Sequence, residues 1–426
     1  MLGIPQTWVS LDSVPWGEAP TGRTPGLPPD GLKAGLLNNC TVCEQEAVKV
    51  VLNQTGPGQA YLVASPKWGA DAAPAAEAAY GEIGRVVQDQ GLTIVHERLF
   101  GSLAVKPAVL AARAAALGAS DIPVDGPITY IQGHPPWGDG LAGIIIQAVA
   151  GLAPGDGVWT IQDRGTAVGR GWRQGEASFL ILQNIQGLSH NGNGANARPL
   201  QTQRLIQRAA HLLEAQGSSY LDVVRTWFYL SDILAWYPEF NRSRTNIYGQ
   251  LGILPGQGNG RLKLPASTGI RGEVSTGAAG AMDLLAVVGP AKSRPPVRQL
   301  SSPGQPEAFQ YGSAFSRGAL IWQPEVNLIQ VSGTAAIDRH GQSLYPHDIR
   351  GQIDCTLEKI AVLIGQVGAG LTDVTAACVF VKHPEHAQVY QEQLTEWGLE
   401  DFPAVVMVAD VCREELLFEI DAEVAF

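Results

Sequence analysis

The chain ends in the stretch LLFEIDAEVAF, residues 416–426, in which apolar and acidic side chains alternate. A period of two is typical of a β-strand, because successive side chains of a strand point to opposite faces. One face of this strand is apolar, and the other carries Glu419, Asp421 and Glu423. Taken alone, three acids on one strand face favour a solvated surface. A special role for Glu419 therefore needs support from the rest of the chain.

The composition is that of a globular protein. The chain has 426 residues, 45% hydrophobic and 16% charged, which predicts two or three domains and excludes disorder of the whole chain. A net charge of −11, with no run of Lys or Arg, gives no electrostatic footprint for nucleic acid and no support for a nuclease. No apolar run is long enough for a membrane span, and residues 1–17 lack a basic region followed by an apolar core, so we expect a soluble, cytoplasmic protein.

The five cysteines do not suggest a disulfide framework, and their odd number fits a reducing compartment. Cys40 and Cys43 have the spacing of a redox motif or half a zinc site. No second pair follows them, so the segment is interpreted as an ordinary loop, and no metal is expected.

One order of elements recurs three times along the chain: a strand hairpin, a long helix, a strand, a shorter helix and a final strand pair. The long helices are predicted at 72–90, 200–216 and 348–366. Pro/Gly-rich segments separate the copies. The predicted division is an N-terminal arm at 1–44, a degenerate module 1 at 45–152, module 2 at 153–295 and module 3 at 306–426.

The last strands of the three copies differ at one position. Where the third copy has Glu419, alignment of the strands places Ile145 in the first copy and Asp283 in the second. The first copy is therefore structural at this position, and the second keeps a shorter acid that is a weaker candidate.

Several arginines lie where they could bind an anion in this acidic chain, since a guanidinium binds a carboxylate bidentately and keeps its charge when buried. Arg225 lies in an alternating strand with Tyr229 on the same face, Arg244 follows on the next helix, and Arg317 precedes the third module's first long strand. Each could equally be a surface or ion-paired arginine. Two loops rich in small and hydroxyl residues could let a ligand approach the backbone, one with Thr268 and one with Gly333.

The repeated module resembles the YjgF/Rid superfamily. That resemblance implies an α+β fold of three consecutive chorismate-mutase-like α/β sandwich modules, closed into a pseudo-trimer within one chain, with a ligand cleft between each pair of modules. A chain that contains its own trimer is expected to be a monomer with internal pseudo-threefold symmetry.

Within that superfamily, residues 128–426 look like the chorismatase family; the first module has no counterpart in this resemblance. The similarity rests on these segments: Arg225-Thr226-Trp227, Tyr237 with Phe240 and Arg244, 265–270, Tyr311-Gly312 with Phe315 and Arg317, 332–335, and 412–419.

The resemblance implies roles for individual residues. Glu419 matches the acid that protonates the enolpyruvyl methylene of chorismate, after which the ether breaks and pyruvate leaves. A raised pKa suits such an acid, and desolvation and its acidic neighbours would supply it. Gly333 and Cys412 match the branch that forms 3-hydroxybenzoate rather than a dihydrodiol. Cys412 is expected to be catalytic together with Glu419, and no metal or organic cofactor is implied. The implied contacts to a small anionic carboxylate substrate are Arg225, Tyr229, Arg244, Thr268, Arg317 and Gly333.

One departure from the family lies on the second helix of the third module. Relatives carry a substrate-binding arginine there, whereas residues 389–393 contain none. Lys382 or His383 is a possible substitute, or the substrate differs.

Two other functions compete with this one. A Rid-type enamine/imine deaminase uses an arginine directly after a Pro-Ala pair, but Val405 and Ser267 stand there in this chain. A non-catalytic scaffold or small-molecule binding protein would instead leave Glu419 on a wet strand face.

Overall fold

The computed structural model describes residues 38–56, 58–150, 157–188, 197–254, 264–290, 294–303, 305 and 307–426. The predicted arm before residue 38 and most of the connector at 151–157 lie outside these ranges. No helix within them is both long and apolar enough to cross a bilayer.

The same order of strands and helices occurs three times, as the sequence predicts. The first module consists of β1 (Asn38–Glu44), β2 (Val48–Thr55), β3 (Gln59–Pro66), α1 (Ala72–Asp89), β4 (Thr93–Gly101), α2 (Lys106–Ala119), β5 (Thr129–Gln132) and β6 (Leu141–Val149). The second consists of β7 (Trp159–Asp163), β8 (Thr166–Gln174), β9 (Ala177–Gln186), α3 (Arg198–Glu214), β10 (Val223–Leu230), α4 (Tyr237–Gln250), β11 (Ala266–Arg271) and β12 (Gly280–Val288). The third consists of β13 (Val297–Leu300), β14 (Gly318–Ile321), β15 (Leu328–Ala335), α5 (Ile349–Gly365), β16 (Val374–Val381), α6 (His386–Glu396), β17 (Ala404–Val408) and β18 (Phe418–Ala425).

Each module forms one six-stranded mixed sheet, and the strand order is the same in all three. In the first module it is β1-β2-β3-β6-β4-β5, with β4 and β5 parallel and the other pairs antiparallel. The chain is therefore an α+β protein of three Rid-like modules.

Two predicted boundaries were wrong. Residues 38–44 form β1, an edge strand that pairs with β2, so they belong to the first module and not to an arm. The short strand β13 starts the third module before residue 306, within a segment whose prolines favoured a connector. Both are edge strands, where proline and weak patterning are tolerated.

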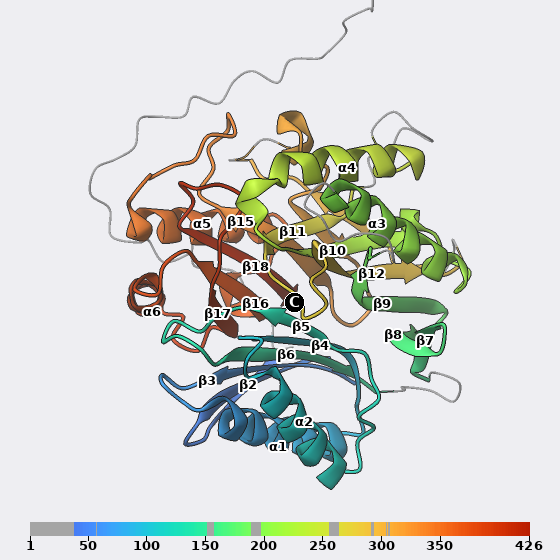
Figure 1. Cartoon of the computed structure of the whole chain (residues 1–426), viewed down its shortest axis with the longest axis vertical. Coiled ribbons are helices and arrows are strands. Elements are labelled where there is room, and N and C mark those ends of the chain that lie inside the picture. Colours follow the sequence, from blue (N-terminus) through green and yellow to red (C-terminus); the bar gives the residue numbers. More distant parts are fainter. Residues whose placement is uncertain are drawn as a thin grey trace, which may run out of the picture. The chain divides into compact units, whose positions relative to one another are not determined.

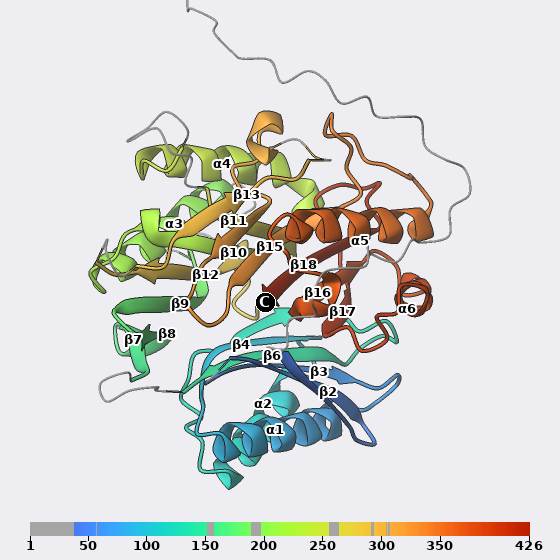
Figure 2. The ribbon, with the colours of Figure 1, turned by 180° about the vertical axis from the view of Figure 1, so that it is seen from behind.

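Each sheet packs its own helices against one face, and the opposite faces of the three sheets share a common core (Figures 1 and 2). In β18 the apolar residues, among them Phe418 and Ile420, pack against α5 and α6 in the third module's own core. The acidic face turns inward instead, so Glu419, Asp421 and Glu423 are all buried. The expectation of a solvated acidic face is therefore wrong, because a sheet between two layers has no wet face.

A ring of backbone hydrogen bonds joins the modules. In each module the last residue of the fifth strand donates its N–H to a carbonyl two residues beyond the corresponding strand of the next module. The three bonds run from Gln132 to Glu273 (2.9 Å), from Arg271 to Asp410 (3.0 Å) and from Val408 to His134 (2.8 Å). The modules thus follow one another around a closed ring, 1 to 2, 2 to 3 and 3 to 1, which is the pseudo-trimer expected from the sequence.

Modules 1 and 3 pack so closely that a glycine is needed between them. A Cβ at Gly143 on β6 would lie 2.6 Å from a methyl group of Val405 on β17 and 2.8 Å from the carbonyl oxygen of Ala64. We expect Gly143→Ala to lower the free energy of unfolding by about 1–3 kcal/mol through overpacking. Urea unfolding measures this change. The matched control is Gly81→Ala on α1, where a Cβ has open space and should stabilise the helix by about 0.5–1 kcal/mol; equal effects would contradict the close packing.

Candidate active site

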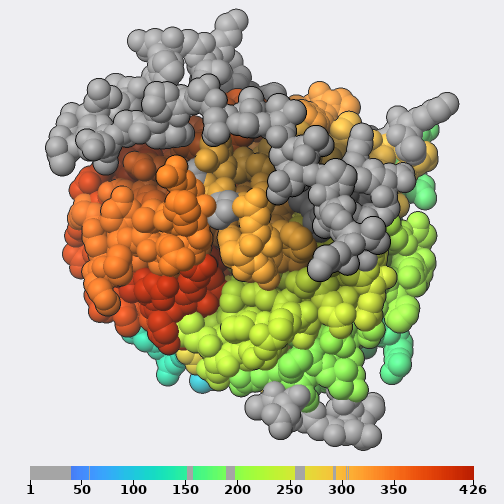
Figure 3. All heavy atoms as spheres, turned by 90° about the horizontal axis from the view of Figure 1, so that it is seen from above, coloured from blue at the N-terminus to red at the C-terminus, as the bar shows by residue number. Residues whose placement is uncertain are grey.

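A cavity of about 970 Å³ lies between the second and third modules. On the face seen in Figure 3, the yellow-green atoms of the second module lie beside the orange and red atoms of the third. The second module contributes the start of α4 and β11, and the third contributes the segment before β14, the end of β15, the β17–β18 loop and the start of β18. Of the predicted site residues it is lined by Arg244, Arg317, Gly333, Cys412 and Glu419.

Glu419 stands out among the three acids of β18. Arg98 of the first module pairs with Glu423 at 2.6 Å, and Arg225 of the second pairs with Asp421 at 3.3 Å. Among the described residues, no cation lies within the 4.0 Å salt-bridge distance of the Glu419 carboxylate. The acid that faces the cavity is thus the one that the neighbouring modules leave without a salt bridge.

Glu419 is only 4% exposed, and this burial governs the charge of its carboxyl group. Desolvation, and then the nearby charge of Asp421, raise the pKa of Glu419 to about 8, against the opposing effect of Arg225 and Arg317. The carboxyl group therefore carries its proton at neutral pH, which suits a proton donor.

Gly333 on β15 makes room for this carboxyl group. A Cβ at this position would overlap Oε1 of Glu419. The Gly333 N–H also donates to Oγ1 of Thr268 on β11, at 3.1 Å, across the boundary between the two modules. A side chain here would displace the acid from the cavity wall, so the absence of a Cβ is what lets Glu419 lie there.

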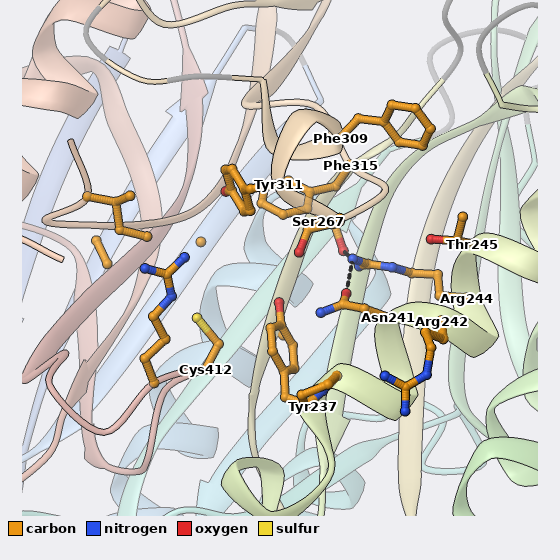
Figure 4. A pocket seen from close by; sticks show the side chains of 18 of the residues that line it. Tyr237, Asn241, Arg242, Arg244, Thr245, Ser267, Phe309, Tyr311, Phe315 and Cys412 are labelled. Carbon is orange, nitrogen blue, oxygen red and sulfur yellow. Dashed lines mark hydrogen bonds between the residues drawn. The ribbon is translucent and has the colours of Figure 1, made fainter. Parts of the chain in front are cut away.

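Arg244 is a buried cation, 1% exposed, that opens on the cavity (Figure 4). Its Nη2 donates to Asn241 at 2.7 Å and its Nη1 to Ser267 at 3.4 Å, while its guanidinium lies 5.0 Å from the ring centre of Phe240. Within the described part of the chain it has no carboxylate partner. A buried guanidinium held only by neutral groups is suited to an anionic ligand.

The first module shows what a structural arginine looks like at the same place. Arg113 and Arg244 are each the eighth residue of a helix with proline at its second position, α2 and α4. Arg113 makes two bonds to Glu97 on β4, at 2.6 and 2.7 Å. Counted from the bulges of β4 and β10, the position of Glu97 is taken by Thr226 in the second module. The change from glutamate to threonine leaves Arg244 without the acid that neutralises Arg113.

Arg317 lies in the third module, directly before β14. It donates to the hydroxyl of Tyr311 at 2.8 Å and lies 5.5 Å from the ring centres of both Tyr311 and Phe315. Arg244 and Arg317 thus bring positive charge to the cavity from two modules.

Cys412 lines the cavity close to Tyr237 (Figure 4). Burial, and then the charge of Glu419, raise the pKa of the Cys412 thiol to about 12. The thiol is therefore neutral at physiological pH and is no thiolate nucleophile.

Three of the predicted substrate contacts do not line the cavity: Arg225, Tyr229 and Thr268. Arg225 is fully buried and bonds to Asp421 and Thr268. Tyr229 lies in the common core, with its ring 6.1 Å from that of Phe100. The strand alternation correctly put Arg225 and Tyr229 on one face, but that face is the common core.

The arginine that is absent from α6 has no bearing on the Glu419 cavity. Ala387, Gln388 and Gln391 of α6 line a separate cavity of about 480 Å³, on the boundary of modules 3 and 1. The helix beside Glu419 is α4, which does carry an arginine. Neither Lys382, which pairs with Glu414 at 2.6 Å, nor His383 lines the Glu419 cavity.

The strand register corrects the alignment of the three copies. Glu419 pairs with Phe380 on β16, and the equivalent pairs are Ala281 with Tyr229 and Gly143 with Phe100. The counterparts of Glu419 are therefore Ala281 and Gly143, whereas Ile145 and Asp283 correspond to Asp421. The other two boundaries thus have no acid at this position.

Some residues of the site escaped the sequence analysis. Asn241 and Arg413 also line the cavity, and Asn241 orients Arg244 from one helical turn away. Its spacing of three from Arg244 is the signal that could have identified it. Among the described residues there is no cluster of potential metal ligands. Cys40 and Cys43 lie on strand β1 and not in a loop. On a strand, two residues that are three positions apart point to opposite faces.

The chain is similar in sequence to several known proteins. The endoribonuclease L-PSP family model matches residues 310–426. A chorismatase of Streptomyces rapamycinicus is 29% identical over 233 residues, which are 48% of this chain and 65% of that protein. A 3-hydroxybenzoate synthase of Streptomyces hygroscopicus is 28% identical over 240 residues, 50% of this chain and 66% of that protein. The matches thus span slightly less than two thirds of the length of these curated relatives.

A solved chorismatase structure has the same fold. It superposes with a TM-score of 0.55 at 20% identity, over 78% of this chain and 93% of its own. That coverage is larger than the stretch 128–426, so part of the first module is included and the view that this module has no counterpart is wrong for the fold.

The two helix arginines should respond differently to removal. Arg113→Met leaves Glu97 buried without its partner and should lower the free energy of unfolding by about 3–5 kcal/mol. Arg244→Met leaves no acid behind, so its cost should stay below about 1 kcal/mol. Urea unfolding of both variants at pH 7 measures the difference, and equal losses would show that Arg244 is structural.

The raised pKa of Glu419 also predicts a pH dependence of stability. Between its usual pKa near 4.5 and about 8, the folded protein holds a proton that the unfolded chain releases. Stability from this group is therefore complete below pH 4.5 and is lost as the pH rises through 8, by about 2–4 kcal/mol. Glu419→Gln should remove this dependence, so that the variant is more stable than the parent at pH 8.5 and similar to it at pH 5. A parallel fall in both proteins would contradict the assignment.

Proposed function

Because the chain is a relative of chorismatase and 3-hydroxybenzoate synthase within the YjgF/Rid superfamily, with a Rid domain at its C-terminal end, we propose that it converts chorismate or a similar enolpyruvyl compound. The reaction removes pyruvate from the substrate. The observation that carries the proposal is Glu419, a protonated acid in a cavity that Arg244 and Arg317 also line.

Glu419 is proposed as the general acid. Its proton goes to the terminal methylene carbon of the enol ether, the C=C π electrons form the new C–H bond, and a cation stabilised by the ether oxygen results. The Glu419 carboxylate that remains lies in the field of Arg225 and Arg317, which stabilises it. The bond between the ring carbon and the ether oxygen then breaks, and its electron pair stays on that oxygen, so the three-carbon unit leaves as pyruvate. The ring cation that remains takes up its own neighbouring hydroxyl oxygen and loses one proton to become aromatic, which returns the proton that Glu419 gave.

Arg244 and Arg317 are the proposed carboxylate-binding residues. Chorismate carries two carboxylates, and the two guanidinium groups approach the cavity from different modules. Each charge-assisted bond to a guanidinium also fixes the substrate in orientation. The same two residues would hold the enolpyruvyl methylene toward Glu419.

We propose 3-hydroxybenzoate as the aromatic product, on the strength of Gly333 and Cys412. Chorismate has the atoms of 3-hydroxybenzoate plus pyruvate, so this outcome consumes no net water. A dihydrodiol would require one water molecule to be incorporated.

The sequence alternatives have less support. In a deaminase the residue after Pro-Ala must reach the ligand, but Val405 packs against Gly143 at the boundary of modules 3 and 1. Ser267 does line the Glu419 cavity, but it accepts a hydrogen bond from Arg244 and cannot grip a carboxylate by charge. A scaffold role would leave the buried proton on Glu419 without use.

Incubation with chorismate tests the proposal. Pyruvate, measured by a coupled lactate dehydrogenase assay, should appear with one aromatic product, and Glu419→Gln should lower kcat by about 10²–10⁴. Since the acid must be protonated, kcat/KM should fall as the pH rises through about 8. Arg244→Met is the companion variant and should raise KM. Equal pyruvate release from the parent and the Glu419→Gln protein would exclude this mechanism, and ammonia from an imine substrate would favour the deaminase.

A further inference from the structure

Arg225 is an unusual cation because it is completely buried and held by only one of its nitrogens. Its Nη2 donates to Oγ1 of Thr268 at 2.7 Å and lies 3.3 Å from Oδ2 of Asp421. Its Nε and Nη1 are buried with no hydrogen-bond partner among the described residues, and its guanidinium lies 4.6 Å from the ring centre of Trp227. Asp421 is the charged group that pairs with it, so we expect the buried cation to depend strongly on that carboxylate.

The acids near Arg225 are distributed one to each partner. Glu423 is taken by Arg98, and Asp421 is the salt-bridge partner of Arg225. Glu419, on the same face of β18, remains for the cavity. If Asp421 carried no charge, Arg225 would lose its salt-bridge partner. Glu419 would then be the acid on this face of β18 that is available to Arg225, since Glu423 is paired with Arg98.

We propose that Asp421 is a positioning residue, which holds Arg225 as a neutral pair and so keeps Glu419 uncharged and directed at the cavity. This inference rests on the proposed role of Glu419 as proton donor. It also changes the role of Arg225. Instead of contacting the substrate, Arg225 is a buried charge whose pairing with Asp421 keeps Glu419 protonated.

The groups around Glu419 support this balance of charges. Those that face it from the surrounding elements are Asp421 on β18, Arg225 on β10, Arg317 before β14, Cys412 in the β17–β18 loop and Tyr237 on α4. Cys412 and Tyr237 stay neutral, because burial raises the pKa of both. Among the described residues, the charged groups that shift the pKa of Glu419 are the acid Asp421 and the arginines Arg225 and Arg317, although Arg244, Arg413, Glu414 and Glu415 also line the cavity. Removal of Asp421 leaves two cations that both favour ionised Glu419.

Thr268 connects the pair to the wall of the cavity. Its hydroxyl oxygen accepts both the bond from Arg225 and the bond from the Gly333 N–H. Arg225 is thus linked through one oxygen to the glycine over which the Glu419 carboxyl group lies. The pair therefore fixes the position of the acid as well as its charge.

Asp421→Asn tests the proposal. We expect the pKa of Glu419 to fall by at least about one unit, as an opposite charge without a partner typically causes. Infrared difference spectroscopy, with the Glu419→Gln protein as reference, follows the carboxyl band of Glu419 against pH without any turnover. The alkaline limb of kcat/KM should move down by the same amount while KM stays unchanged, because Asp421 does not line the cavity.

Two further variants separate positioning from general damage. Glu423→Gln also removes a buried, arginine-paired carboxylate from this face, but the Arg98 pair is not among the groups that act on Glu419, so the pKa should shift by less than about 0.3 unit. The double variant Asp421→Asn with Arg225→Met removes both charges and should return the pKa of Glu419 to about 8 or above.

An unchanged carboxyl titration in Asp421→Asn, or a double variant whose titration stays low, would overturn the inference. If the single variant does not fold, the double variant decides alone, since it leaves no buried charge unpaired. The infrared result stands even if chorismate is not the substrate, so failure of this inference and failure of the proposed function can be told apart.

Discussion

The site depends on the packing of β11, in the second module, against β15 of the third module. The Ser316 N–H donates to the Pro265 carbonyl, and the Ser267 N–H donates to the Ser332 hydroxyl, at 3.0 and 2.8 Å. Because three such boundaries close a ring, the inner faces of the sheets lose all contact with solvent. An acid on such a face must be paired, protonated or placed at a cavity. Glu423 and Asp421 are paired with arginines, and Glu419 is protonated. Of these three acids, Glu419 is the one that also lines the cavity.

Three modules in one chain can differ where the subunits of a true trimer cannot. At the boundary of modules 1 and 2, Glu97 neutralises the helix arginine and Ala281 replaces the acid. At the boundary of modules 3 and 1, α6 carries no arginine and Val405 covers Gly143. An unneutralised helix arginine and a protonated acid therefore meet at one boundary among the described residues. At the other two boundaries, as far as the described residues show, this combination of an unneutralised helix arginine and a protonated acid is absent.

The sequence predicted the fold and half of the site, and the failures have physical causes. The periodicity of 416–426 identified the face of the strand on which Glu419 lies. An alignment of two strands that is displaced by two residues keeps every side chain on the same face. The sequence therefore matched Glu419 to Asp283, whereas its counterpart is Ala281. The bulges that set the true register leave no mark in a pattern of period two. The order in which the modules close the ring decides which helix faces which strand across a boundary. The helix that faces Glu419 is α4, and α6 faces the first module. The absence of an arginine from α6 is therefore no evidence against the site.

The burial of Arg225 shows that this site keeps buried polar atoms without hydrogen bonds among the described residues. A well-packed apolar pair at Arg225 and Asp421 would be expected to stabilise the fold as well as this ion pair does, since the desolvation of two charges offsets much of their attraction. Two of its guanidinium nitrogens remain without hydrogen bonds. What the pair provides is a nearly neutral environment beside Glu419. Asp421 opposes ionisation of Glu419 more than Arg225 favours it, so the pair as a whole holds the acid in its protonated form, which is the form that the proposed reaction needs.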